Sequence, residues 1–205
     1  IAHLLDVVPV VDWRALGHLS AFDVRGYGIA AWISAVRGDR QSTDSWVHRG
    51  LDLADARGDL FGRALVLLAE VQSRAILGDP KGVAALARKV YDELTELGVV
   101  QLATSARIIE RWSLSIDPDG PDTADEIRMA IERHAGDGTR IFLPMYYALL
   151  ADAELAQRRN QRAVAALDLG AAVADATGER VWDRQLAARR ARLRAASAVS
   201  MPISL

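Results

Sequence analysis

The chain contains no cysteine, which excludes disulfide bonds, thiolate nucleophiles and thiolate metal ligands together. It also lacks any apolar run of about 18 residues, the minimum for a transmembrane helix, so no membrane span is expected. The first residue is Ile1, and no charged segment with an apolar core follows it, so we expect the chain to be part of a longer protein. Together these features favour a cytoplasmic location.

Positive charge is not in surplus either. The 205 residues carry a formal net charge of −2, and lysine occurs only as Lys81 and Lys89. The chain therefore lacks the basic excess of nucleic-acid-binding proteins, and we expect no direct nucleic-acid contact. Arginine greatly outnumbers lysine, which indicates a GC-rich bacterial genome. One basic run is predicted to be a solvated helix face, with an acidic or phosphate-bearing partner as the alternative: Arg184, Arg189, Arg190, Arg192 and Arg194.

The side-chain combinations that catalysis needs are missing as well. None of the four histidines has a second histidine three or four residues away, so no zinc helix motif is predicted. Carboxylates are plentiful, but they lie beside arginine or lysine, where pairing on a helix surface explains them. No G-x-S-x-G or S-x-x-K sequence supplies a nucleophilic serine, and no G-x-x-x-x-G-K-[ST] sequence supplies a phosphate loop. We therefore expect a non-enzyme without metal or cofactor.

What the sequence does contain is a spacing of 40 residues. Glycine recurs at this interval just after apolar-periodic stretches, as Gly58, Gly98, Gly138 and Gly178. Between these positions, Gly38 and Gly78 repeat the feature, and Asp117-Pro118 and Asn160 are the predicted stops in the later repeats. Glycine suits the left-handed residue that ends a helix because it has no Cβ. The spacing therefore predicts four pairs of helices.

The predicted first helices of these pairs cover residues 22–37, 61–77, 100–116 and 140–158. The second helices cover 42–57, 80–97, 122–135 and 161–177, and a closing helix covers 179–197. Candidate N-terminal caps are Ser42 or Thr43, Asp79-Pro80, and the stretch 119–122 before Thr123. A helix pair of this size cannot bury its apolar face alone, so neighbouring pairs must stack.

These features predict an all-α fold, a right-handed superhelical stack of antiparallel helix pairs similar to tetratricopeptide repeats. The period of about 40 exceeds the roughly 34 residues of a standard tetratricopeptide repeat, so a HEAT-type solenoid stays open as the alternative. We expect residues 1–19 to form a linker or partial helix from an upstream module, 20–197 the repeat domain, and 198–205 a C-terminal tail.

Residues 143–197 resemble the closing repeats of large bacterial regulators that combine a STAND-type ATPase with MalT-like tetratricopeptide repeats. This family includes LuxR-type transcriptional regulators and actinobacterial proteins with an attached adenylyl cyclase. The residues that carry the resemblance are Gly178, Glu179, Arg180, Trp182, Asp183, Leu186 and Arg190. Val181, Gln185 and Ala191 depart from the family's usual ending. The resemblance implies a role in signal transduction or transcription regulation, in which other domains perform the chemistry.

The resemblance also implies that the first helix of each pair lines a concave inner surface. Arginine there can hold a carboxylate through two parallel hydrogen bonds, and a neighbouring aromatic ring adds a stacking surface. Pairing of these charges within the chain is the alternative interpretation. The candidate ligand- or partner-binding residues on these helices are Arg63, Glu70, Arg74, Arg107, Arg111, Tyr147 and Asp152.

The sequence therefore predicts a domain for protein–protein or interdomain interaction within a multidomain regulator. Its expected partner is a protein, a peptide, or the regulator's own ATPase or output domain. The alternative function is an effector sensor that binds a peptide or a small anionic ligand in the concave groove. A homodimer is a further expected form of association, because the exposed end of a repeat stack can pair with its copy.

Overall fold

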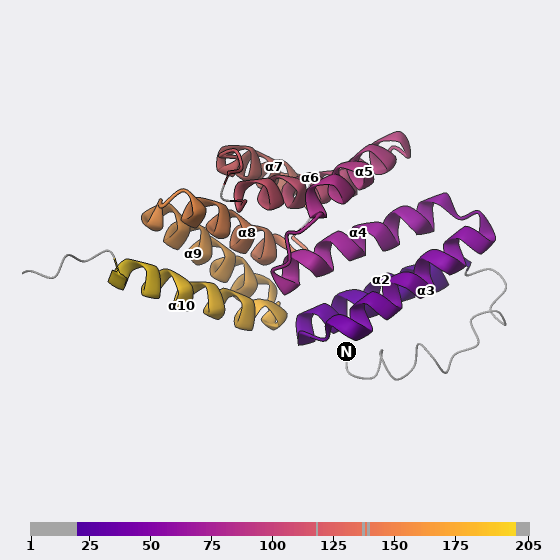
Figure 1. Ribbon diagram of the computed structural model, residues 1–205, viewed down its shortest axis with the longest axis horizontal. Coiled ribbons are helices and arrows are strands. Elements are labelled where there is room, and N and C mark those ends of the chain that lie inside the picture. The colour runs from indigo at the N-terminus through magenta and orange to yellow at the C-terminus, as the bar shows by residue number, and fades with distance from the viewer. Residues whose placement is uncertain (1–19, 118, 137, 139, 200–205) are drawn as a thin grey trace, which may run out of the picture. The chain divides into compact units, whose positions relative to one another are not determined.

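A computed structural model describes residues 20–117, 119–136, 138 and 140–199. The predicted linker 1–19 and the tail from residue 200 lie outside these described residues. Within them every regular element is helical, which confirms the all-α class (Figure 1). The chain divides into two compact units, residues 1–106 and 107–205, and the boundary falls within one helix.

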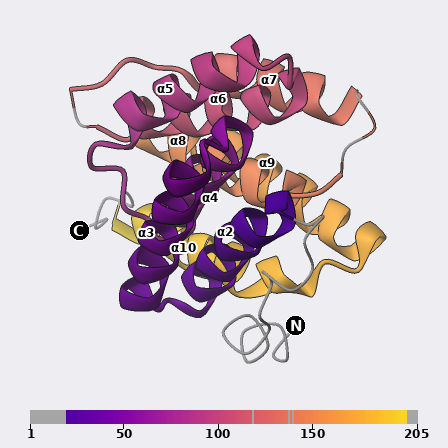
Figure 2. The same cartoon turned by 90° about the vertical axis from the view of Figure 1, so that its right-hand side faces the viewer.

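The first unit begins with the helices α2 (Ser20–Arg37), α3 (Arg40–Arg57), α4 (Leu60–Leu77) and α5 (Val83–Glu96). Helix α6 (Val100–Ser115) contains the boundary between the units. Helices α2, α3 and α4 pack against one another, and α4 also packs against α5 (Figures 1 and 2). The core shared by α2, α3 and α4 includes Val24, Ala31, Val47, Ala54 and Val66.

The second unit continues with α7 (Ala124–Gly136), α8 (Leu143–Ala156) and α9 (Asn160–Thr177). A short 3₁₀ turn (Arg180–Trp182) then leads into α10 (Asp183–Val199). Helix α8 packs against α7 and α9, and α10 packs against both α8 and α9. Apart from Glu154, the largest buried side chains of α7 to α9 are apolar or aromatic, namely Ile127, Ile131, Tyr146, Leu149 and Leu167.

Glycine ends several helices, as the 40-residue spacing predicts. Gly58, Gly78 and Gly178 follow α3, α4 and α9 in the left-handed conformation, with φ of 63°, 69° and 73°. The prediction of Asn160 as a stop was wrong, because Asn160 is the first residue of α9. Arg158 takes the left-handed conformation instead, with φ 58°, at the place where earlier repeats have Gly38 and Gly78.

Some predicted helix starts also differ. Asp39, rather than Ser42 or Thr43, caps α3, because its carboxylate accepts the backbone N–H of Ser42 at 3.0 Å. Asp59 caps α4 in the same way and accepts the backbone N–H of Gly62 at 2.8 Å. Helix α5 begins at Val83 and not at Pro80, since Gly82 turns left-handed with φ 73°. The turn is closed by the Val83 N–H, which donates to the Pro80 carbonyl at 3.0 Å.

Two glycines inside helices mark equivalent close contacts in the two units. A Cβ added at Gly50 of α3 would lie 3.0 Å from the Cβ of Tyr27 on α2 and 3.0 Å from Val66 on α4. A Cβ added at Gly170 of α9 would lie 3.2 Å from the Cβ of Tyr147 on α8 and 3.2 Å from Leu186 on α10. All three residues of the second contact lie three 40-residue periods after those of the first. The same helix packing therefore recurs in the two units.

Ion pairs link successive helix pairs within each unit. In the first unit the guanidinium of Arg40 lies 2.6 Å from the carboxylate of Asp79. In the second unit Arg159 donates to both oxygens of Asp122, with one bond of 2.8 Å. Both bonds join the start of one second helix to the next turn between helices, but the acidic and basic partners are exchanged.

Candidate functional site

The charged candidate residues on α4 form ion pairs with other residues of the first unit. Arg63 lies 3.1 Å from Asp55 and 3.4 Å from Glu93. Arg74 donates to the carboxylate of Glu70 at 2.6 Å. The structure thus contains the intramolecular pairing that the sequence left as the alternative at Arg63, Glu70 and Arg74, and a binding role for them stays a prediction.

The candidate arginines on α6 form ion pairs with glutamates of the second unit. Arg107 donates to Glu110 at 2.8 Å, and the Glu110 side chain is only 3% exposed. Arg111 lies 3.0 Å from Glu126 on α7. The Arg107 pair lies within α6, whereas the Arg111 pair connects α6 to α7. A ligand contact of either guanidinium group would require it to leave its carboxylate.

Asp152 of α8 holds two arginines of the closing helix. Its oxygens accept from Arg189 at 2.9 Å and from Arg192 at 3.0 Å. Arg189 is one of the most buried charged residues of the unit, with 6% of its surface exposed. Part of the arginine run that the sequence assigns to a solvated helix face therefore fixes α10 to α8.

Tyr147, a candidate from the sequence, lines a pocket in the second unit. This pocket, which we call the α8 groove, has a volume of about 360 Å³. Helices α7 and α9 form its walls, and α8 forms its floor. The lining residues are Arg128, Ile131 and Glu132 of α7, Tyr147, Leu150 and Glu154 of α8, and Arg162, Ala165, Ala166 and Leu169 of α9. In each helix they are three or four residues apart, so each helix presents one continuous stripe.

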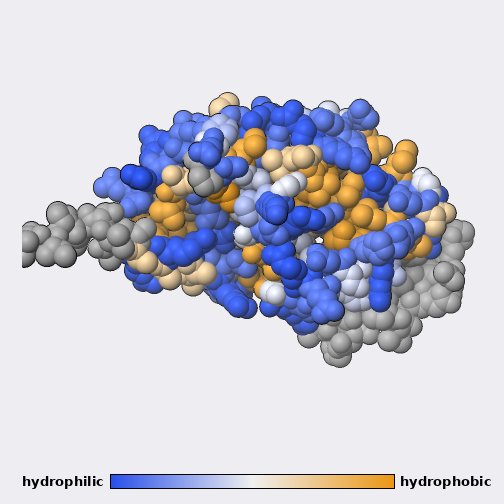
Figure 3. Space-filling model, in the orientation of Figure 1, coloured by the Kyte–Doolittle hydropathy of each residue, from blue (hydrophilic) through white to orange (hydrophobic). Residues whose placement is uncertain are grey.

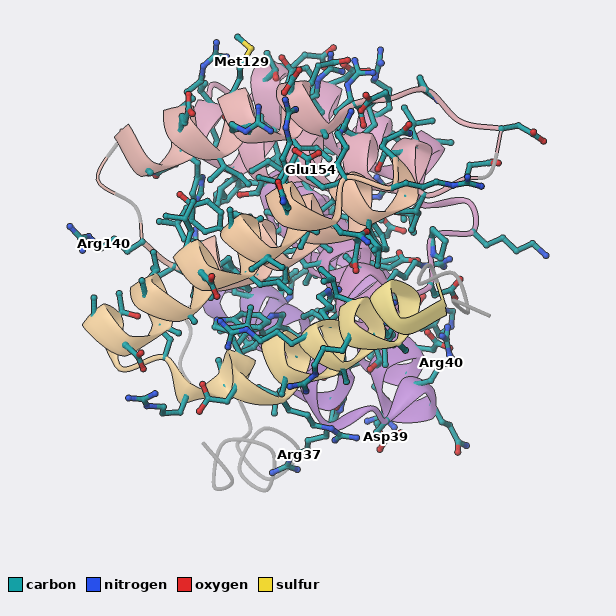
Figure 4. The ribbon with its side chains drawn as sticks, turned by 90° about the vertical axis from the view of Figure 1, so that its left-hand side faces the viewer. Arg37, Asp39, Arg40, Met129, Arg140 and Glu154 are labelled. Atoms are coloured by element: carbon teal, nitrogen blue, oxygen red, sulfur yellow. The ribbon has the colours of Figure 1, made fainter. Side chains whose placement is uncertain are left out.

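Glu154 anchors one end of the α8 groove. Its side chain is 1% exposed and lies between α7 and the helices α8 and α9 (Figure 4). One carboxylate oxygen accepts from Arg128 of α7 at 2.6 Å, and the other accepts from Arg159 in the turn before α9. A buried carboxylate needs such partners because desolvation of an unpaired charge is costly. The two arginines therefore fix three helices around one negative charge.

The same network extends to Asp122, ahead of α7. Hydrogen bonding from Arg159 lowers the pKa of the Asp122 carboxyl, and Asp122 together with Glu154 raises the pKa of Arg159. A carboxyl whose pKa is lower in the folded state stabilises the fold at pH above its unfolded pKa of about 3.9. This contribution is lost as the pH falls through the lower folded pKa.

We expect Arg159→Gln to raise the pKa of Asp122 toward the ordinary value of about 3.9, because the charged donor is removed. A pH titration of the aspartate carboxyl carbons by NMR measures this change. Asp79 is the internal control, since its own pKa is lowered by Arg40 and should stay the same. An Asp122 pKa that is equal in the two proteins would show that Arg159 is not its stabilising partner.

The opposite end of the α8 groove is formed by Tyr147, Glu132 and Leu169. Burial, followed by the negative charge of Glu132, raises the pKa of the Tyr147 hydroxyl. Leu169 is apolar and 52% exposed. Figure 3 shows hydrophobic atoms at the surface over α8 and α9, at the left of the view. This end therefore offers an aromatic ring and apolar surface next to one carboxylate.

The sequence predicted only one of the residues that line the α8 groove, namely Tyr147. Its walls come from the second helices of the pairs, whereas the resemblance directed attention to the first helices. The stripe Arg162, Ala165, Ala166 and Leu169 has helical spacing in the sequence. Nothing in that spacing says that the stripe stays uncovered, because this depends on where α7 and α9 lie relative to each other.

Within the described residues no group of three or more His, Cys, Asp or Glu side chains is arranged to hold a metal ion. No helix in the described ranges combines the length and the apolar character required to cross a bilayer. Comparison of the chain with protein-family models, with curated proteins and with solved structures finds no match.

Proposed function

We propose that this chain is a non-catalytic helical-repeat domain that binds a segment of another protein, or of another domain of its own protein. The observation that carries the proposal is the α8 groove, in which stripes from three helices surround an apolar centre with charges at both ends. Grooves between helices are a common docking place for peptide segments. The other charged candidates are paired with carboxylates or guanidinium groups of the chain itself, so the α8 groove is the better binding surface.

The repeated packing around Gly50 and Gly170 supports the finer proposal that the chain builds a right-handed superhelix of tetratricopeptide-like pairs. The resemblance of residues 143–197 to MalT-like repeats supports a place in a bacterial signalling or transcriptional regulator. In such a protein the groove would hold an output domain or an external partner, while chemistry would occur in other domains.

An effector sensor is the second candidate function. The volume of about 360 Å³ falls within the 300–1,000 Å³ typical of small-molecule sites. A small ligand with a carboxylate would place it at Arg162 and its apolar part on Leu150. In this case the occupied groove would change the position of an attached domain, because a ligand favours the conformation that it binds better.

Ala165→Trp is expected to weaken partner binding strongly without unfolding the chain. Ala165 lines the α8 groove and is exposed, so a tryptophan side chain can occupy the groove without entering the core. We expect the affinity for a partner to fall by about tenfold or more, as for changes at the centre of an interface. Quantitative co-purification from the source cells measures this loss, and circular dichroism checks the helical content.

The matched control is Ala187→Trp, at an exposed alanine of α10 that does not line the groove. A partner that is retained by the wild type and by Ala187→Trp, but lost with Ala165→Trp, supports the proposal. A partner that both variants retain equally would place the binding surface elsewhere and contradict the assignment to the groove.

A further inference from the structure

Two exposed charges of opposite sign lie in the α8 groove. Arg162 of α9 and Glu132 of α7 both line it, and both are exposed. Neither takes part in a hydrogen bond or ion pair with another residue that the structure describes. This sets them apart from Arg128 and Glu154, which are bonded to each other. Arg162 and Glu132 are therefore the groove charges that a ligand can pair with at least cost to the fold.

These two charges lie at opposite ends of the groove. Helix α8 runs antiparallel to α7 and α9, because short turns connect them. Arg162 lies two residues into α9, at the end where α8 finishes with Glu154. Glu132 acts on the Tyr147 hydroxyl, near the start of α8. The groove thus runs from a positive end to a negative end over the stripe from Tyr147 to Glu154, about 10 Å at 1.5 Å per residue.

The centre of the groove between these ends is apolar, and its α9 wall carries small side chains. Ile131 and Leu150 are 0% and 3% exposed and form the base. Ala165 and Ala166 on the α9 wall carry only a methyl group each, which lets the backbone of a ligand approach closely. One apolar side chain of a ligand can therefore reach the base while its ends stay near the two charges.

From this arrangement we propose that the α8 groove binds a two-turn helical segment of a partner protein, with an acidic residue, a central apolar residue and a basic residue at positions i, i+3 or i+4, and i+7. This inference rests on the proposed function and names the chemistry of the partner. Residues i and i+7 of a helix lie about 10 Å apart on one face, which matches the length of the groove. The acidic residue pairs with Arg162, the basic residue pairs with Glu132, and the apolar residue contacts Leu150.

Three synthetic helix-stapled peptides test this proposal against the full chain. All carry leucine at the centre, and their ends are acid and base, acid and acid, or base and base. They are titrated by fluorescence anisotropy into the wild type, Arg162→Glu and Glu132→Arg. The groove has one positive end in the wild type, none in Arg162→Glu and two in Glu132→Arg. The expected preferences depend only on these numbers, so they hold for either direction of the peptide helix.

Each protein is expected to prefer the peptide that complements its own ends. The wild type should favour acid and base, Arg162→Glu should favour base and base, and Glu132→Arg should favour acid and acid. Each mismatched end should weaken binding about threefold to fivefold at low salt, as for exposed charge pairs. The preference should fade at 1 M salt, where screening acts within about 3 Å.

Equal binding of all three peptides, with loss in Ala165→Trp, would overturn the charge pattern and leave the proposed groove function intact. Preferences that do not follow the two substitutions would also overturn the charge pattern. A third outcome is that no peptide binds and that Ala165→Trp does not weaken the binding of an identified partner or small ligand. This result would overturn both the inference and the assignment of binding to the groove.

Discussion

Glu154→Ala is expected to lower the free energy of unfolding of the second unit by about 3–5 kcal/mol, the usual cost of removing one partner from a buried ion pair. The Glu154 side chain is 1% exposed and is bonded to Arg128 and to Arg159. Its removal leaves two guanidinium groups close together without their shared carboxylate, next to a cavity. Urea unfolding followed by the indole N–H signals of Trp112 and Trp182 in NMR spectra measures the change, since both lie in this unit.

The control for this prediction is Asp175→Ala. Asp175 pairs with Arg180 at 2.6 Å, but the two side chains are 66% and 64% exposed. An exposed pair contributes about 0–1 kcal/mol, so this variant should unfold almost as the wild type does. If Glu154→Ala and Asp175→Ala lost equal stability, the buried carboxylate would not be the element that joins α7, α8 and α9.

Trp182→Ala should have an effect of similar size, about 3–5 kcal/mol, for a different reason. Trp182 is 1% exposed at the junction of α9 and α10, and its ring lies 5.9 Å from the ring of Phe142 before α8. Its indole N–H donates to Glu179 at 2.8 Å. Truncation leaves a cavity between segments that are far apart in the sequence, and the neighbours can fill it only in part.

Met129→Ala tests whether apolar truncation in this unit is destabilising in general. Met129 is also a large side chain, but it is 66% exposed on α7 (Figure 4). A change within about 0.5 kcal/mol is expected, as for surface positions without special contacts. A tolerated Trp182→Ala, at the level of Met129→Ala, would contradict the role of Trp182 in fixing the start of α8 against α10.

Local features of the sequence predicted the helices well. Helices α2, α3 and α4 extend over 20–37, 40–57 and 60–77, close to the predicted 22–37, 42–57 and 61–77. Apolar periodicity and terminal glycines act within a few residues, so a single sequence contains them. The starts were less accurate, because the caps Asp39 and Asp59 let α3 begin two residues and α4 one residue earlier than the apolar pattern suggests.

The turns around α8 show where local patterns are insufficient. The predicted helix 140–158 is in fact 143–156, since Phe142 and Arg158 both adopt positive φ, 67° and 58°. Side chains with a Cβ seldom adopt this conformation, so nothing in these residue types predicts it. The Phe142 ring lies beside Tyr146 and Trp182, which are contacts that only the folded chain provides.

The candidate site was harder to predict because it depends on how neighbouring helices cover each other. The arginine stripes on α4 and α6 have the composition of a binding surface. However, one arginine of each stripe pairs with a glutamate of the next helix, Glu93 or Glu126, and another pairs with a glutamate of its own helix. Conversely, the alanines at 165 and 166 carry no chemical group that indicates binding. They become part of a groove only because α7 and α9 leave α8 open between them.

The most direct test of the α8 groove is an amide NMR titration of the full chain with the peptide that carries acidic and basic ends. The proposal predicts that the largest shift changes occur at groove residues such as Ile131, Leu150 and Ala166, and that they disappear in Ala165→Trp. Shift changes centred on Arg63, Arg74 and Arg107 instead, and retained in Ala165→Trp, would contradict it and return the binding surface to the arginines of α4 and α6.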